Sequence, residues 1–235
     1  SFLIGEYAES ERRNPVFTVA DTILWLSEDV DRNSTTRKLR VVKIRGRGPV
    51  PGLHTFRLSG AGAQVFPRIP EQQRQRTVRR EERLATGVPG LDEMTGGGIP
   101  AGDVVLLTGP AGSGKTTFAT QFVAQGLRDG ESCVVAVFEE YPEAYLARAK
   151  TAAVDFDGMI EDGRLAVTYL RPLDLSVDEM LAEIEQAVTR VGATRVVIDS
   201  LSEIRLLAQS GLRYRKQILA LKQFFARRKA TVLFL

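Results

Sequence analysis

The chain has 235 residues, with 32 basic and 29 acidic side chains and a formal net charge of +3. Hydrophobic residues make up 43% and charged residues 26%, which is typical of a globular protein and excludes a disordered chain. The apolar runs are much shorter than the roughly 20 residues that a membrane-spanning helix needs. No secretory leader is visible, and the single cysteine, Cys133, excludes an internal disulfide. We therefore expect a cytoplasmic protein without a membrane association.

The first part of the chain, residues 1–70, predicts a small β-rich segment. Strands are expected at residues 22–26 and 39–45. Two further short strands, 53–58 and 63–66, flank a turn that contains glycine, and this pattern is typical of a β-hairpin. The segment should therefore form an antiparallel sheet.

Residues 71–84 are predicted to be a basic linker. Between Arg68 and Arg83 there are six arginines and three glutamates, and the apolar residues show no periodicity. Such a composition indicates a solvated connection rather than packed structure.

Residues 85–235 predict an α/β core in which short apolar strands alternate with helices. Helical stripes of apolar residues lie at 177–191, with Gly192 as a stop signal, and at 214–225. The expected strands are 104–107, 133–138, 165–170, 195–198 and 231–235. Continuous apolar strands separated by helices predict a parallel sheet with both faces covered.

The end of the chain is basic. From Arg205 to the last residue there is no acidic side chain. The cations that follow are Arg213, Arg215, Lys216, Lys222, Arg227, Arg228 and Lys229. We interpret them as a solvated helix face, with nucleotide phosphates or a partner's acidic surface as the alternative. A net charge of +3 is a weak field, so DNA is not an expected partner.

The strongest motif is GPAGSGKT at residues 109–116, which fits the phosphate-loop pattern G-x-x-x-x-G-K-[ST] between a predicted strand and a predicted helix. Its glycines let backbone N–H groups turn toward phosphate oxygens, and the helix N-terminus favours the same anion. Lys115 supplies a cation for the β- and γ-phosphates and contributes to catalysis. The expected nucleotide-binding residues are Gly109, Ala111, Gly112, Ser113, Gly114, Lys115, Thr116 and Thr117.

Three acidic residues follow predicted strands. Asp199 directly follows the strand 195–198, and together with the Thr116 hydroxyl it is expected to bind Mg²⁺. The alternative is that Asp199 only caps the helix that follows. Glu139 and Glu140 follow the strand 133–138, at the sheet edge where ligands of parallel sheets bind. Adjacent side chains point in opposite directions, so we expect one of the two to orient the attacking water. The alternative is a surface acidic pair.

Several spaced motifs resemble the RecA-type ATPases of the KaiC group, the family of the circadian-clock ATPase. In the second half they are 86–92 (TGVPGLD), 96–102 (GGGIPAG), 138–140 (FEE) and 197–202 (VIDSLS). In the first half they are 17–21 (FTVAD), 23–26 (ILWL), 42–46 (VKIRG) and 52–57 (GLHTFR), which resemble the end of a KaiC-type domain. The resemblance covers nearly the whole chain.

The resemblance implies a RecA-like fold and a slow, ring-forming signalling or clock-type ATPase with unidentified protein partners. In that family ATP lies between subunits of a hexameric ring, and a Lys-x-Arg pair from the neighbouring subunit reaches the γ-phosphate. Lys43 and Arg45 hold the matching positions here. Clock-type members also phosphorylate themselves on Ser or Thr, so autokinase activity is a further implication.

The order of the two parts is reversed relative to a single domain of that family, since the closing strands precede the phosphate loop. One interpretation is a segment that spans the end of one repeat and most of the next, with the second core incomplete at its C-terminus. Lys43, Arg45 and Lys115 would then not share one site. The alternative is exchange of segments between neighbouring chains.

Two other functions use the same core. A DNA-binding recombinase of the RadA or RecA type is one, although no paired Cys-x-x-Cys module is present. The other is a scaffold that assembles when it binds a nucleotide and for which hydrolysis is incidental.

Overall fold

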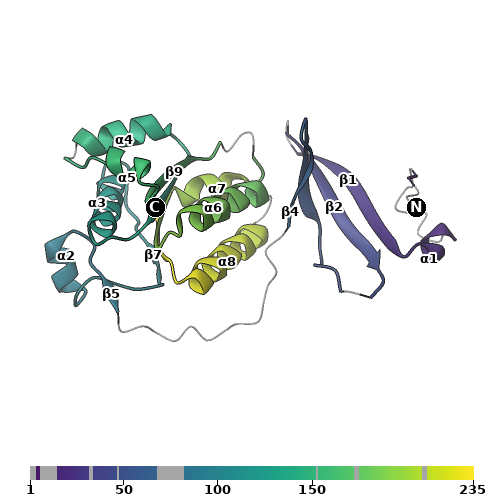
Figure 1. The fold of residues 1–235 in the computed structure, drawn as a ribbon, viewed down its shortest axis with the longest axis horizontal. Coiled ribbons are helices and arrows are strands. Elements are labelled where there is room, and N and C mark those ends of the chain that lie inside the picture. Colours follow the sequence, from purple (N-terminus) through teal and green to yellow (C-terminus); the bar gives the residue numbers. More distant parts are fainter. Residues whose placement is uncertain are drawn as a thin grey trace. The chain divides into compact units, whose positions relative to one another are not determined.

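The computed structural model describes residues 4–5, 15–31, 34–46, 48–67, 82–151, 153–171, 175–207 and 211–235. The chain divides into two compact units, Ser1–Pro70 and Glu71–Leu235 (Figure 1).

The first unit contains a four-stranded antiparallel sheet in the order β1–β2–β3–β4, preceded by a short helix. The elements are α1 (Val16–Val19), β1 (Thr22–Asp31), β2 (Ser34–Ile44), β3 (His54–Ser59) and β4 (Gly62–Phe66). The predicted β-rich, antiparallel segment is thus confirmed, with β1 and β2 longer than expected. The register between β1 and β2 shifts between Ile23 and Leu24. The Phe17 ring meets the Trp25 ring edge-on, with centroids 6.4 Å apart.

The second unit is built on a five-stranded parallel sheet in the order β7–β11–β10–β8–β9. Its strands are β7 (Val104–Leu106), β8 (Cys133–Val137), β9 (Leu165–Tyr169), β10 (Arg195–Asp199) and β11 (Thr231–Phe234). Each predicted strand is present, and the predicted α/β fold class is confirmed. The first strand of the sheet therefore lies beside the last one in sequence.

Helices cover both faces of this sheet (Figure 1). One face carries α3 (Lys115–Arg128), α4 (Pro142–Thr151) and α5 (Asp157–Glu161), and the other carries α6 (Val177–Val191), α7 (Leu201–Leu207) and α8 (Gly211–Arg228). Successive strand side chains alternate between the two layers, and both sets are buried. Among the helices that the structure describes, none has the length and hydropathy of a membrane span.

The two helices predicted from periodicity correspond to α6 and α8. A capping box begins α6: the Ser176 hydroxyl accepts a hydrogen bond from the Glu179 amide, and the Glu179 carboxylate accepts one from the Ser176 amide. The helix ends at Gly192, whose φ of +64° is left-handed, as the stop signal predicts.

The entry into the second unit differs from the sequence prediction. Arg83 and Leu84, assigned above to the linker, instead form β5 (Arg83–Leu84), which pairs with β6 (Ile99–Pro100). The Arg83 guanidinium donates hydrogen bonds to the carbonyls of Thr95 (2.7 Å) and Gly98 (2.8 Å). The sequence analysis placed this charge in a solvated linker, but in the structure it anchors a loop. Residues 71–81 of the predicted linker lie outside the described residues. Between β5 and β6 lies α2 (Pro89–Met94).

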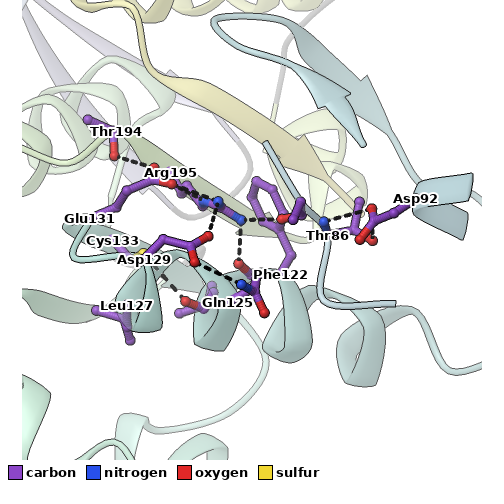
Figure 2. A network of polar contacts seen from close by, with 12 residues as sticks. Thr86, Asp92, Phe122, Gln125, Leu127, Asp129, Glu131, Cys133, Thr194 and Arg195 are labelled. Carbon is purple, nitrogen blue, oxygen red and sulfur yellow. Dashed lines mark hydrogen bonds and ion pairs between the residues drawn. The ribbon is translucent and has the colours of Figure 1, made fainter. Parts of the chain in front are cut away.

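A buried arginine joins this entry to the core (Figure 2). Arg195, the first residue of β10, is 0% exposed. Its Nε and Nη2 donate to the Glu131 carboxylate (3.0 and 2.6 Å), and its Nη1 donates to the carbonyls of Phe122 (3.1 Å) and Ala85 (2.7 Å). The guanidinium also lies 4.7 Å from the centre of the Phe122 ring. One side chain thereby ties residue 85, α3 and the sheet together.

Arg195 also explains a glycine within α3. A Cβ on Gly126 would lie 2.5 Å from Cδ and 2.6 Å from Nε of Arg195, so no larger residue fits beside the arginine. Glycine within a helix costs about 1 kcal/mol relative to alanine. Here the close approach of the buried arginine requires it.

The Cys133 thiol provides a first prediction. The side chain is fully buried in β8, and burial raises the pKa of the thiol from 9.0 to about 12. Folded protein should therefore resist thiol reagents near pH 8, and labelling should follow the unfolded fraction. The thiol ionises at lower pH in the unfolded chain than in the folded protein. The free energy of unfolding should therefore fall as pH rises from 9 toward 12, by up to about 1.4 kcal/mol per pH unit from this group. Labelling rates in increasing urea show whether modification of Cys133 follows the unfolded fraction. Rapid labelling of the native protein would contradict the protection of this thiol.

Candidate nucleotide site

The phosphate loop connects β7 to α3, as predicted. Gly109, Ala111, Gly112, Ser113 and Gly114 lie in this exposed loop, and Lys115, Thr116 and Thr117 form the first turn of α3. Gly112 and Gly114 have φ angles of +76° and +90°, and a Cβ at either would meet no atom within 4 Å. The first amides of α3 have no partner within the helix, so loop and helix together form a cradle for an anion.

Lys115 lies over this loop. Its ammonium group donates hydrogen bonds to the carbonyls of Gly109 (2.9 Å) and Pro110 (3.0 Å). An ammonium group has three donors, so one remains for an oxygen atom of a bound anion. The arrangement suits a phosphate group.

Thr116 and Asp199 meet although 83 residues separate them. The Thr116 hydroxyl donates to the Asp199 carboxylate at 2.8 Å. Asp199 is the last residue of β10, and its carbonyl accepts a hydrogen bond from the Phe138 amide at 3.2 Å. Hydroxyl and carboxylate oxygens are the hard ligands that Mg²⁺ prefers, so this pair fits that ion.

The two glutamates that follow β8 differ in environment. Glu140 forms an ion pair with Arg148 of α4, and its side chain is 23% exposed. Glu139 is exposed. Both follow the carboxyl end of β8, which pairs in parallel with β10, so they lie on the same edge of the sheet as Asp199.

Behind this edge, Tyr145 connects α4 to α3. Its side chain is 1% exposed, and its hydroxyl is hydrogen-bonded to the Thr120 hydroxyl (3.3 Å). The Thr120 hydroxyl also donates to the Thr116 carbonyl at 2.8 Å. Burial raises the pKa of Tyr145 to about 12, against an opposing effect of the Thr120 hydrogen bond and the Arg148 charge.

The sequence analysis did not identify Thr120, Tyr145 or Arg148. Two weak signals could have revealed Tyr145 and Arg148. Tyr145 and Ala149, four residues apart, are the buried residues of α4. Arg148 follows Glu140 by eight residues, a spacing that has significance only once a helix is known to begin at Pro142.

Lys43 and Arg45 belong to the first unit, whereas Lys115 belongs to the second. The Lys43 ammonium donates to the carbonyls of Thr18 (3.0 Å) and Phe17 (3.3 Å), and Arg45 pairs with Asp21 (3.0 Å). Because β2 ends at Ile44, Arg45 begins a turn rather than closing a strand as predicted. A hollow of about 570 Å³ lies beside Lys43, lined also by aromatic residues of this unit.

A family model for the ATPase KaiC matches residues 84–235. The chain belongs to the KaiC ATPase family. The match covers the described core from Leu84 of β5 to β11, including the phosphate loop, Glu139, Glu140 and Asp199. The resemblance to KaiC-like ATPases of the RecA superfamily is thereby confirmed, and the KaiC domain implies nucleotide binding and an ATPase.

Curated relatives extend the similarity into the first unit. The circadian clock oscillator protein KaiC of Prochlorococcus marinus is 29% identical over 201 residues, which cover 86% of this chain and 40% of that protein. The protein of the same name from Parathermosynechococcus lividus is 28% identical over 209 residues, 88% of this chain and 38% of that protein. KaiC 1 of Synechocystis sp. is 27% identical over 201 residues. The chain thus spans about two fifths of the length of these relatives.

Proposed function

We propose that this chain binds ATP together with Mg²⁺ and hydrolyses it slowly, as part of a ring-forming signalling ATPase. The observation that carries the proposal is the hydrogen bond of 2.8 Å between the Thr116 hydroxyl and the Asp199 carboxylate. It joins the end of the phosphate loop to the end of the apolar strand β10, which is separated from β7 by β11 in the sheet. A glycine-rich turn that arose by chance has no reason to meet such a carboxylate.

In this proposal the backbone amides of the loop and of the first turn of α3 bind the phosphates. Lys115 adds a cation at the β- and γ-phosphates. Thr116 and Asp199 supply oxygen ligands for Mg²⁺, which when bound neutralises charge on the phosphate oxygens.

Glu139 is the residue that we propose to orient the attacking water and to accept its proton. Its carboxylate is exposed at the carboxyl edge of the sheet, while that of Glu140 is engaged by Arg148. A water molecule can reach the exposed carboxylate of Glu139, whereas the Arg148 guanidinium occupies an oxygen of Glu140.

We further propose that Lys43 and Arg45 act on a phosphate of a neighbouring copy in a homo-oligomeric ring, a hexamer by analogy with the family. A cation that approaches the γ-phosphate stabilises the charge that develops in the transition state. A clock role, autokinase activity and the binding of signalling protein partners remain predictions from the resemblance.

The test is Mg²⁺-ATP hydrolysis per chain at increasing protein concentration, with Lys115→Ala as the blank. We expect specific activity to rise with concentration, because each site is completed by a neighbour. Lys43→Ala together with Arg45→Ala should remove that rise. Constant activity above the blank would exclude the role of the neighbouring copy, and activity equal to the blank at every concentration would refute the ATPase proposal.

A further inference from the structure

Arg148 connects the acidic pair to a rigid part of the molecule. It lies on the exposed side of α4 and forms an ion pair with Glu140, which precedes that helix. Its guanidinium also lies 5.9 Å from the centre of the Tyr145 ring, one helical turn earlier. A cation over an aromatic ring is attracted to the face of that ring. The group that holds Glu140 is therefore itself held by a buried side chain.

Tyr145 continues the connection to the phosphate loop. Its ring stacks on Phe156 with centroids 6.4 Å apart and an interplanar angle of 7°. Its hydroxyl is bonded to that of Thr120, which donates to the Thr116 carbonyl at 2.8 Å. A continuous series of contacts thus leads from Glu140 to the residue whose hydroxyl binds the Asp199 carboxylate.

From these contacts we infer that Arg148 is a positioning residue for hydrolysis. By fixing Glu140 against α4 it sets the conformation of the segment after β8, so that the adjacent Glu139 is presented to the phosphate loop at a constant geometry. This inference rests on the proposed function, and it deepens that proposal by explaining why two adjacent glutamates have different roles. Arg148 acts through Glu140 and does not itself touch the nucleotide.

Stability alone does not account for the pair. The side chains of Arg148 and Glu140 are 51% and 23% exposed, and exposed ion pairs contribute little to folding. The effect on catalysis can be much larger, since a small displacement of a reacting group can lower a rate by about 100-fold. We therefore expect the ion pair to affect the position of Glu139 more than it affects the free energy of folding.

The experiment compares the wild-type chain with Arg148→Met, Arg148→Lys, Glu140→Gln and the Arg148→Met/Glu140→Gln double variant. Lys150→Met is the matched control, because Lys150 is a cation of the same helix that pairs with Asp155 and Asp157 instead. Two quantities are measured: steady-state ATP hydrolysis, with Lys115→Ala as blank, and amide hydrogen exchange of α4 without nucleotide. The exchange measurement reports the anchoring of α4 independently of hydrolysis.

We expect Arg148→Met to lower kcat by about ten-fold with KM for ATP within about two-fold of wild type, because the phosphate contacts are elsewhere. Glu140→Gln should cause a similar loss, and the double variant should be no worse than either, since both changes break one interaction. The Lys variant should recover most of the rate, because a single ammonium can replace this contact. Exchange of the first turn of α4 should accelerate in Arg148→Met and stay unchanged in Lys150→Met.

Unchanged exchange in Arg148→Met would overturn the anchoring of Glu140, whatever the rates. Faster exchange with unchanged kcat, or losses that add in the double variant, would overturn the positioning role. Wild-type hydrolysis equal to the Lys115→Ala blank, with the exchange difference present, would refute the proposed ATPase and the positioning role together while leaving the anchor intact.

Discussion

Glu139→Gln is expected to lower kcat for ATP hydrolysis by about 100-fold or more while nucleotide binding stays intact. A glutamine amide has nearly the same shape as the carboxylate but cannot accept the proton of the attacking water. The loop amides, Lys115 and Thr116 are unchanged, so affinity should remain within about two-fold of wild type. Single-turnover hydrolysis gives the rate, and titration with a fluorescent ATP analogue gives the affinity.

Glu140→Gln is the matched control, because it removes the same charge one residue away. We expect a loss of about ten-fold, since this change disturbs only the position of its neighbour through Arg148. A larger loss in Glu140→Gln than in Glu139→Gln would reverse the assignment of the two glutamates. Weakened binding in Glu139→Gln would place that residue among the nucleotide ligands.

Arg195→Met is expected to reduce the free energy of unfolding of the second unit by about 3–5 kcal/mol. Methionine fills much of the same volume but leaves the Glu131 carboxylate without its buried cation. It also removes the donor that serves the carbonyls of Ala85 and Phe122. Urea unfolding followed by helical circular dichroism measures the effect, because α2 to α8 all belong to this unit.

Arg164→Met provides the comparison for Arg195→Met. Arg164 precedes β9, its side chain is 33% exposed, and it donates to the Leu127 carbonyl at 3.1 Å and lies 3.5 Å from Asp162. We expect a loss below about 1 kcal/mol, because water can replace these contacts. Equal losses in the two variants would mean that the burial of Arg195 has no energetic consequence.

Most of the second unit could be predicted from sequence because its strands are continuous apolar runs. Each of β7 to β11 appears within a residue of its expected position, and α6 shows both its capping box and its terminal glycine. The short helix α4 escaped prediction because only Tyr145 and Ala149 are buried along it, too few to produce a visible stripe. The two-residue strand β5 was hidden within a charged stretch.

For the site, the sequence predicted which residues gather but not how they are held. The phosphate loop and the approach of Asp199 to Thr116 follow from a motif and from the rule that parallel strands end at one edge. The difference between Glu139 and Glu140 depends on Arg148, a contact that periodicity cannot reveal. In the sequence, nothing distinguishes Arg195 from other strand residues, because only the packed structure brings Glu131, Phe122 and Ala85 around it.

The sheet order also has a consequence for the synthesis of the protein. Among the described strands β7 pairs with β11 alone, and about 125 residues lie between them. At roughly 5–20 residues per second, the ribosome needs roughly 6–25 s to deliver the neighbour of the strand that carries the phosphate loop. Until then β7 is an apolar strand with both edges open, the kind of segment that invites aggregation. A complete nucleotide site therefore has to wait until β11 has left the ribosome.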